Sequence, residues 1–187
     1  MMKTNNVMIL MMAILVSFFA FGAGKKIPSL TFEGVAVKGA TDRFAQRMYS
    51  RGFLMESIVN FDINMVGTWE GRPGAKVRIA GNNDNSDIKY VEAVIFVRDD
   101  WNDIKKAYDD IVETFAGRWG TPARASYLFD GQDGNDVNDT AKMLRLIAGK
   151  ADVWSAWNMK DGSVCVSIRY ADSKFHISTK YTPTLFY

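Results

Sequence analysis

The stretch from Asp99 to Pro122 limits the fold more than any other part of this 187-residue chain, because it predicts one long helix with a wide apolar face. Asp99 or Asp100 is suited to cap its start, and Gly120 with Pro122 to end it. A helix of this kind has to bury its apolar face against other elements, so it belongs to a core. Seven residues follow helical spacing on that face: Trp101, Ile104, Tyr108, Ile111, Val112, Phe115 and Trp119.

The residues before this helix predict a short strand at 30–32, another helix and then three strands. The helix begins at Thr41 or Asp42, and Gly52 is placed to end it. The strands are expected at 61–65, 75–79 and 88–98, with a turn at Arg72-Pro73-Gly74 and a polar loop at 82–87. The last of them is apolar on both faces, which favours a central, covered position. The apolar face of the helix is expected to hold Phe44, Ala45, Met48 and Tyr49.

The residues after the long helix predict four strands and one short helix. Asn138 is placed to cap the helix, and the strands are expected at 124–129, 152–159, 163–170 and 175–181. The sequence therefore predicts an α+β fold, with an antiparallel sheet and helices packed on one face, in two helix-plus-three-strand halves. One domain is expected at 25–187, either as a single unit or as two similar halves at about 27–98 and 99–182. The apolar face of the short helix is expected to hold Ala141, Leu144, Ile147 and Ala148.

The first 24 residues predict a signal peptide. Lys3 precedes an apolar run at 7–21, and the small residues suited to cleavage near its end are Ala20, Gly22, Ala23 and Gly24. The alternative is an uncleaved membrane anchor, because residues 4–24 carry no charge and about 20 apolar residues can span a bilayer. Cleavage is the favoured interpretation, and it predicts a periplasmic or extracellular protein with no membrane attachment after processing.

Composition argues against several functional classes. The net charge of +2 and the absence of long basic runs argue against nucleic acid binding. Cys165 is the only cysteine, so no disulfide forms within the chain. His176 is the only histidine, which leaves too few nitrogen and sulfur ligands for zinc. The sequence also lacks the short motifs of nucleophilic and metal-dependent hydrolases, so no catalytic residue is predicted.

Two sets of residues are the candidates for binding. Exposed tryptophans can stack on sugars or anchor a protein partner, and Trp69, Trp154 and Trp157 are the candidates outside the long helix, although core packing is the commoner role of such rings. Trp154 and Trp157 are expected to face opposite sides of a strand. Calcium is the one cofactor for which the chain offers a candidate loop, with oxygen ligands at Asp133, Asn135, Asp136 and Asp139, although such loops usually serve as turns and helix caps.

A pattern of aromatic residues and glycines resembles an uncharacterised family of secreted proteins from Bacteroidales-type gut bacteria. The resemblance covers most of residues 30–172 and implies a fold, but no catalytic residue. The layout is also similar to β-lactamase-inhibitor-protein-like domains and to related outer-membrane assembly lipoproteins, although the lipid-attachment cysteine of the latter is missing here. The pattern consists of Phe32-Glu33-Gly34-Val35, Gly39, Phe44, Gly52-Phe53, Gly67 to Gly71, Trp101, Trp119 to Pro122, Trp157 and Gly162-Ser163-Val164.

Three functions stay open on the sequence alone. The leading hypothesis is an exported, non-enzymatic binding or interaction module for an unknown protein or glycan. The first alternative is a small hydrolase of a cell-envelope polymer that uses paired carboxylates. The second alternative is a structural or assembly protein of the envelope. A broad exposed apolar patch would favour the binding module, and two carboxylates that converge in a cleft would favour the hydrolase.

Overall fold

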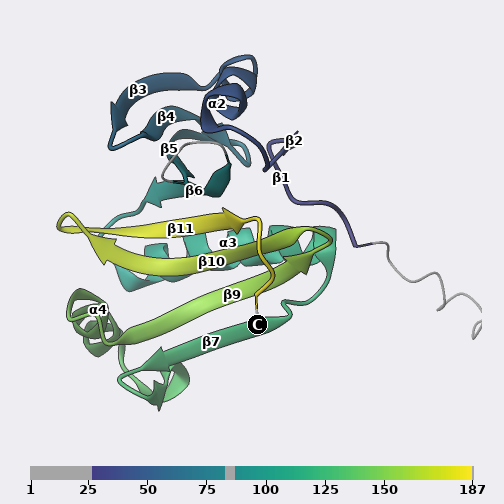
Figure 1. Ribbon diagram of the computed structural model, residues 1–187. Coiled ribbons are helices and arrows are strands. Elements are labelled where there is room, and N and C mark those ends of the chain that lie inside the picture. Colours follow the sequence, from purple (N-terminus) through teal and green to yellow (C-terminus); the bar gives the residue numbers. More distant parts are fainter. Residues whose placement is uncertain (1–26, 83–86, 187) are drawn as a thin grey trace, which may run out of the picture.

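A nine-stranded antiparallel sheet forms the centre of the fold in the computed structural model, which describes residues 27–82 and 87–186 (Figure 1). The strand order is β3-β4-β5-β6-β11-β10-β9-β7-β8, and the α+β class expected from the sequence is confirmed. The predicted signal peptide at 1–24 lies outside the described residues. No helix within the described part of the chain is long and apolar enough to cross a membrane.

The two halves of the chain each contribute one long run of neighbouring strands to this sheet. The first half contains β1 (Thr31–Phe32), β2 (Val35–Ala36), α2 (Thr41–Tyr49), β3 (Leu54–Val59), β4 (Asp62–Trp69), β5 (Arg72–Gly81) and β6 (Ile88–Phe96). The second half contains α3 (Trp101–Trp119), β7 (Arg124–Phe129), β8 (Gln132–Asp133), the 3₁₀ helix η1 (Gly134–Asp136), α4 (Asp139–Ile147), β9 (Ala151–Met159), β10 (Gly162–Ala171) and β11 (Lys174–Thr182).

The halves join where β6 pairs antiparallel with β11, so their last strands lie at the middle of the sheet. The central position expected for 88–98 is thus confirmed. Each half runs outward from this junction through consecutive neighbours, to β3 on one side and to β7 and β8 on the other. Each half supplies four long strands: the first half gains Leu54–Val59, which was not predicted, and the four strands predicted after the long helix all form.

One face of the sheet carries the apolar core, and the helices pack on that face. Helix α3 lies behind β10 and β11 in Figure 1, and the C-terminal segment crosses the opposite face. Asp100 caps α3 by accepting hydrogen bonds from two backbone N–H groups of its first turn. The predicted stripe of α3 is largely buried, with Val112 and Trp119 at its margin. Burial of its five innermost side chains contributes roughly 10 kcal/mol before conformational entropy is subtracted. They are Trp101, Ile104, Tyr108, Ile111 and Phe115.

Three local predictions were wrong, each for a physical reason. The turn expected at Arg72–Gly74 lies at Glu70-Gly71, where both residues adopt positive φ, and β5 already begins at Arg72. On α2, Tyr49 is 65% exposed because it lies a rotation of about 100° away from Met48, which is fully buried at the middle of the core-facing side.

Helix α4 buries a different face from the one that its apolar residues predict. Leu144 and Ile147 are exposed, whereas Lys142 and Leu146 are buried. Lys142 is tolerated there because its ammonium group lies 5.0 Å from the centre of the Trp101 ring and 3.2 Å from the Asp139 carboxylate. A sequence pattern counts that lysine as polar and so places the buried face on the wrong side of the helix.

Two glycines are expected to respond in opposite ways to substitution by alanine. A Cβ atom at Gly67 would lie 2.4 Å from the Phe53 ring, whereas one at Gly117, within α3, would meet nothing within 4 Å. We expect Gly67→Ala to destabilise the fold by about 2 kcal/mol or more, and Gly117→Ala to stabilise it by about 0.5–1 kcal/mol. Urea unfolding of both variants measures the difference. A Gly67→Ala variant as stable as the unaltered protein would contradict the close packing of the Phe53 ring on Gly67.

Candidate functional site

Among the strands of the described residues, β3 is the one long strand in which every residue is exposed. Within the described residues it pairs with β4 alone, so it forms an edge of the sheet and its outer backbone groups have no ladder partner. We call its apolar side chains together with that of Phe61 the β3 patch. The patch consists of Leu54 (58% exposed), Met55 (53%), Ile58 (60%), Val59 (54%) and Phe61 (65%).

The β3 patch has apolar side chains on both faces of the strand. Met55 and Ile58 lie opposite Met65 and Ile63 of β4, which point into the core, so they continue the helix-covered face beyond the core. A β-bulge between Met55 and Ser57 changes the alternation, and it explains why the sequence LMESIV does not read as a strand. The other apolar residues of the strand, Leu54 and Val59, lie on the opposite face with Ser57.

The turn after β3 holds a large apolar side chain in a strained conformation. Val59 pairs with Asp62, and the two residues between them have positive φ, 49° at Asn60 and 71° at Phe61, as in a type I′ hairpin turn. Asn is favoured in such a turn, but its second position strongly favours Gly, and a bulky residue there costs about 1 kcal/mol or more. The ring gains little burial in return, so local stability does not account for Phe61.

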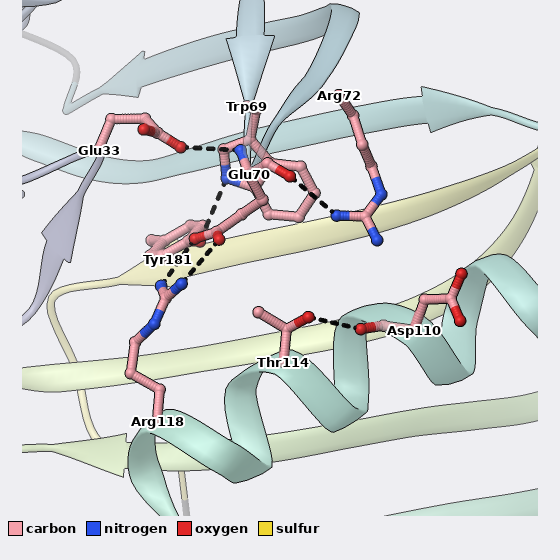
Figure 2. Close-up of polar contacts among 8 residues, drawn as sticks. All are labelled: Glu33, Trp69, Glu70, Arg72, Asp110, Thr114, Arg118 and Tyr181. Atoms are coloured by element: carbon pink, nitrogen blue, oxygen red, sulfur yellow. Dashed lines mark hydrogen bonds and ion pairs between the residues drawn. The ribbon is translucent and has the colours of Figure 1, made fainter.

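A second constellation of polar side chains (Figure 2) lies where the β1–β2 turn meets the end of α3. It adjoins a pocket of about 330 Å³, which we call the corner pocket. Glu33 and Glu70 occupy the same position in two Glu-Gly hairpin turns, with φ of 48° and 47°. Glu33 Oε1 accepts a hydrogen bond from the backbone N–H of Glu70 at 3.0 Å. Both carboxylate oxygens of Glu70 accept from Arg118, each at 2.8 Å.

These contacts tie together three elements that are far apart in the sequence. Glu33 belongs to the β1–β2 turn, Glu70 to the β4–β5 turn, and Arg118 to the last turn of α3. Beneath them, Trp69 Nε1 donates to the Tyr181 hydroxyl at 3.3 Å, and burial raises the pKa of Tyr181. A carboxylate pair for hydrolysis needs one acid that is able to give up a proton and one base that is able to take one. Here both glutamates already accept hydrogen bonds that hold the fold together.

The helix-free face of the sheet holds a shallow groove of about 450 Å³ next to β3, which we call the open-face groove. Glu56 of β3 pairs there with Lys76, and Ser178 donates a hydrogen bond to Glu92. His176 also lines the groove, and its Nδ1 has no hydrogen-bond partner among the described residues. Burial lowers the pKa of His176, so the ring is neutral at pH 7.

The tryptophans proposed for binding occupy three different environments. Trp69 and Trp157 are buried in the core, at 0% and 2% exposure. Trp154 lies on the opposite face from Trp157, as predicted, and is half-buried because Phe186 packs on it with ring centres 5.0 Å apart. Of the three residues, Trp154 is therefore the one whose ring a ligand can reach without opening the core.

The loop proposed for calcium uses its polar side chains for local structure. Asp133 Oδ1 accepts from the N–H of Asn135 at 2.8 Å, and Asp139 pairs with Lys142. Asp136 lies in η1, beside Asn135. In residues 27–82 and 87–186, no three His, Cys, Asp or Glu side chains are grouped as a metal site requires. Calcium binding at this loop stays a prediction.

Cys165 lies on the helix-free face at partial exposure, and burial raises the pKa of its thiol.

No family model, no curated protein and no solved structure matches this chain. The resemblance to secreted Bacteroidales-type proteins therefore stays a prediction.

The single histidine allows a direct test of its own burial in the open-face groove. The folded-state pKa of His176 lies below the unfolded value of about 6.5, so the unfolded chain binds more protons as the pH falls. His176 therefore contributes stability above about pH 6.5, and this contribution is lost as the pH falls toward the folded pKa. We expect the ring signals of the untagged protein to titrate below pH 6.5 by proton NMR, and His176→Gln to reduce the loss of stability between about pH 7 and 5. A titration midpoint at or above 6.5 would contradict the burial of this ring.

Proposed function

We propose that this protein is an exported, non-enzymatic interaction module that binds an extended polypeptide segment by strand addition to β3. The β3 patch is the single observation that carries the proposal. An edge strand presents unpaired N–H and C=O groups that a further strand can bind, and the side chains on its two faces set the specificity. Export rests on the signal peptide predicted at 1–24.

The other edge of the sheet supports the choice of β3. Natural edge strands avoid pairing when they are short, or when they carry charges, proline or strong bulges. Strand β8 has two residues, and β7 begins with Arg124. Strand β3 has six residues without Lys, Arg or Pro, and the charge of Glu56 is already matched by Lys76. Its one protective feature is the bulge.

Phe61 adds an independent reason. Residues held in unfavourable backbone conformations concentrate where a protein binds or reacts, because local stability is sacrificed there. An exposed aromatic ring at the tip of the β3–β4 turn extends the apolar surface beyond the strand and is a typical anchor of an interface. The corner pocket gives the hydrolase alternative no support, because Glu33 and Glu70 already accept hydrogen bonds that link parts of the fold.

A strand-forming peptide tests whether β3 accepts a partner. We expect a capped octapeptide of alternating valine and threonine to shift the NMR amide signals of β3 and β4 when it is titrated into dilute ¹⁵N-labelled protein. Ile58→Lys should weaken this binding about tenfold or more. Leu144→Lys is the matched control, because Leu144 on α4 is also 60% exposed. Shifts confined to other regions, or none at all, would refute the proposal.

The substitution Phe61→Gly is expected to change stability and peptide binding in opposite directions. Phe61→Gly should stabilise the fold by about 0.5–1 kcal/mol, because glycine adopts the positive φ of 71° without strain. The same change should weaken peptide binding, because the exposed ring is lost. Urea unfolding and the peptide titration measure the two effects. A variant that is both less stable and fully able to bind would show that the ring serves the fold.

A further inference from the structure

We infer that the segment bound by β3 is β3 of a second copy of this chain, so that the protein forms a two-fold symmetric dimer through one continuous sheet. This inference rests on the proposed function and names its partner.

The two faces of β3 determine the register in which two copies can pair. Met55 and Ile58 lie on the helix-covered face, as their partners on β4 show. Leu54, Ser57 and Val59 lie on the helix-free face, where Glu56 also contacts Lys76. Strands that pair antiparallel about a two-fold axis place side chains of the same face opposite each other. The register must therefore match face with face along the whole strand.

One full-length register satisfies this condition at every position. In it, Leu54 lies opposite Val59 of the second copy, Met55 opposite Ile58, and Glu56 opposite Ser57. A shift by one residue sets Leu54 against Ile58, on opposite faces, and so disrupts the whole match. In the matched register each apolar side chain meets another apolar side chain, which is the pairing that stabilises neighbouring strands.

Charge is compatible with the same register. Like charges directly opposite each other would destabilise a symmetric pair, because every residue appears twice. Glu56 is the only charged residue of β3; it meets Ser57 rather than itself, and Lys76 of its own chain neutralises it. In the continuous sheet, Met55 and Ile58 lie beside the same residues of the second copy. The two copies thus form one apolar surface at β3, on the face of the sheet that carries the helices.

The exposed area sets an upper limit on the dimer interface. With exposed fractions of 53–65%, the five side chains of the β3 patch present roughly 500 Å² of apolar surface per copy, so a dimer that covered all of it would bury about 1,000 Å², the size at which specific interfaces begin. Backbone hydrogen bonds between the two edges add to this. A two-fold interface is closed, because each copy has one such edge, and so the assembly stops at two.

The experiment is sedimentation equilibrium of the mature protein as recovered from cells, over a concentration series and after its mass has been determined. We expect a transition from one to two copies. Ile58→Lys should raise the dissociation constant about tenfold or more, because each introduced ammonium group meets Met55 of the other copy. Leu144→Lys should leave the dimer unchanged. Circular dichroism confirms that both variants fold.

A mixture of two variants tests the register itself. Met55→Glu and Ile58→Lys should each fail to dimerise at concentrations where the unaltered protein does. An equimolar mixture should form a heterodimer, because the new carboxylate of one copy then lies opposite the new ammonium group of the other. A dimer unaffected by Ile58→Lys, larger assemblies, or no rescue in the mixture would overturn the inference. If the protein is a monomer that still binds the octapeptide at β3, the dimer is refuted but the proposed function stands. If it is a monomer that does not bind the octapeptide, the proposed function is refuted as well.

Discussion

The pairing of β6 with β11 is the constraint on which the other features depend. It joins two runs of four long strands into one sheet and places the last strand of each run at the centre. The first long strand of each run then lies farthest from the centre, with only the two-residue β8 beyond β7, because strands close in sequence are neighbours in the sheet. Strand β3 is exposed for this reason. Its apolar residues would suit a strand with neighbours on both sides, but the topology provides one neighbour only.

The corner pocket shows how the outer parts of the first half are held to the second. Glu70 connects the β4–β5 turn to the end of α3 through Arg118, and Glu33 adds the N-terminal arm through the backbone of Glu70. Glutamate is unfavourable at the positive-φ position of such turns, where Asn, Asp or Gly is usual. It is retained here because a longer side chain reaches the neighbouring element. The strain at these two positions thus has a structural explanation, whereas nothing in the described residues explains the strain at Phe61.

The sequence predicted elements where local pattern and burial agree. The α3 stripe, the Asp100 cap and the central position of 88–98 were confirmed, because each depends on periodicity or on capping chemistry. The errors arose where tertiary contacts bury a residue that the hydrophobic pattern counts as exposed, as at Lys142, which is buried against Trp101. Strand β3 was missed because its bulge removes the alternation. The corner pocket was missed because Glu33, Glu70 and Arg118 are brought together by topology alone; the repeated Glu-Gly turn was the one available signal.

The position of the bulge bears on how β3 works. A bulge usually blunts an edge, since it twists the strand and breaks the outer ladder. In β3 it lies at Glu56, in the middle of the strand, and turns this carboxylate toward Lys76 on the helix-free face. In the proposed dimer, the apolar pairs flank a polar centre, which an aggregating sheet would not tolerate but a single matched partner would. The open edge and the single matching register of the proposed dimer together favour a specific partner over non-specific stacking.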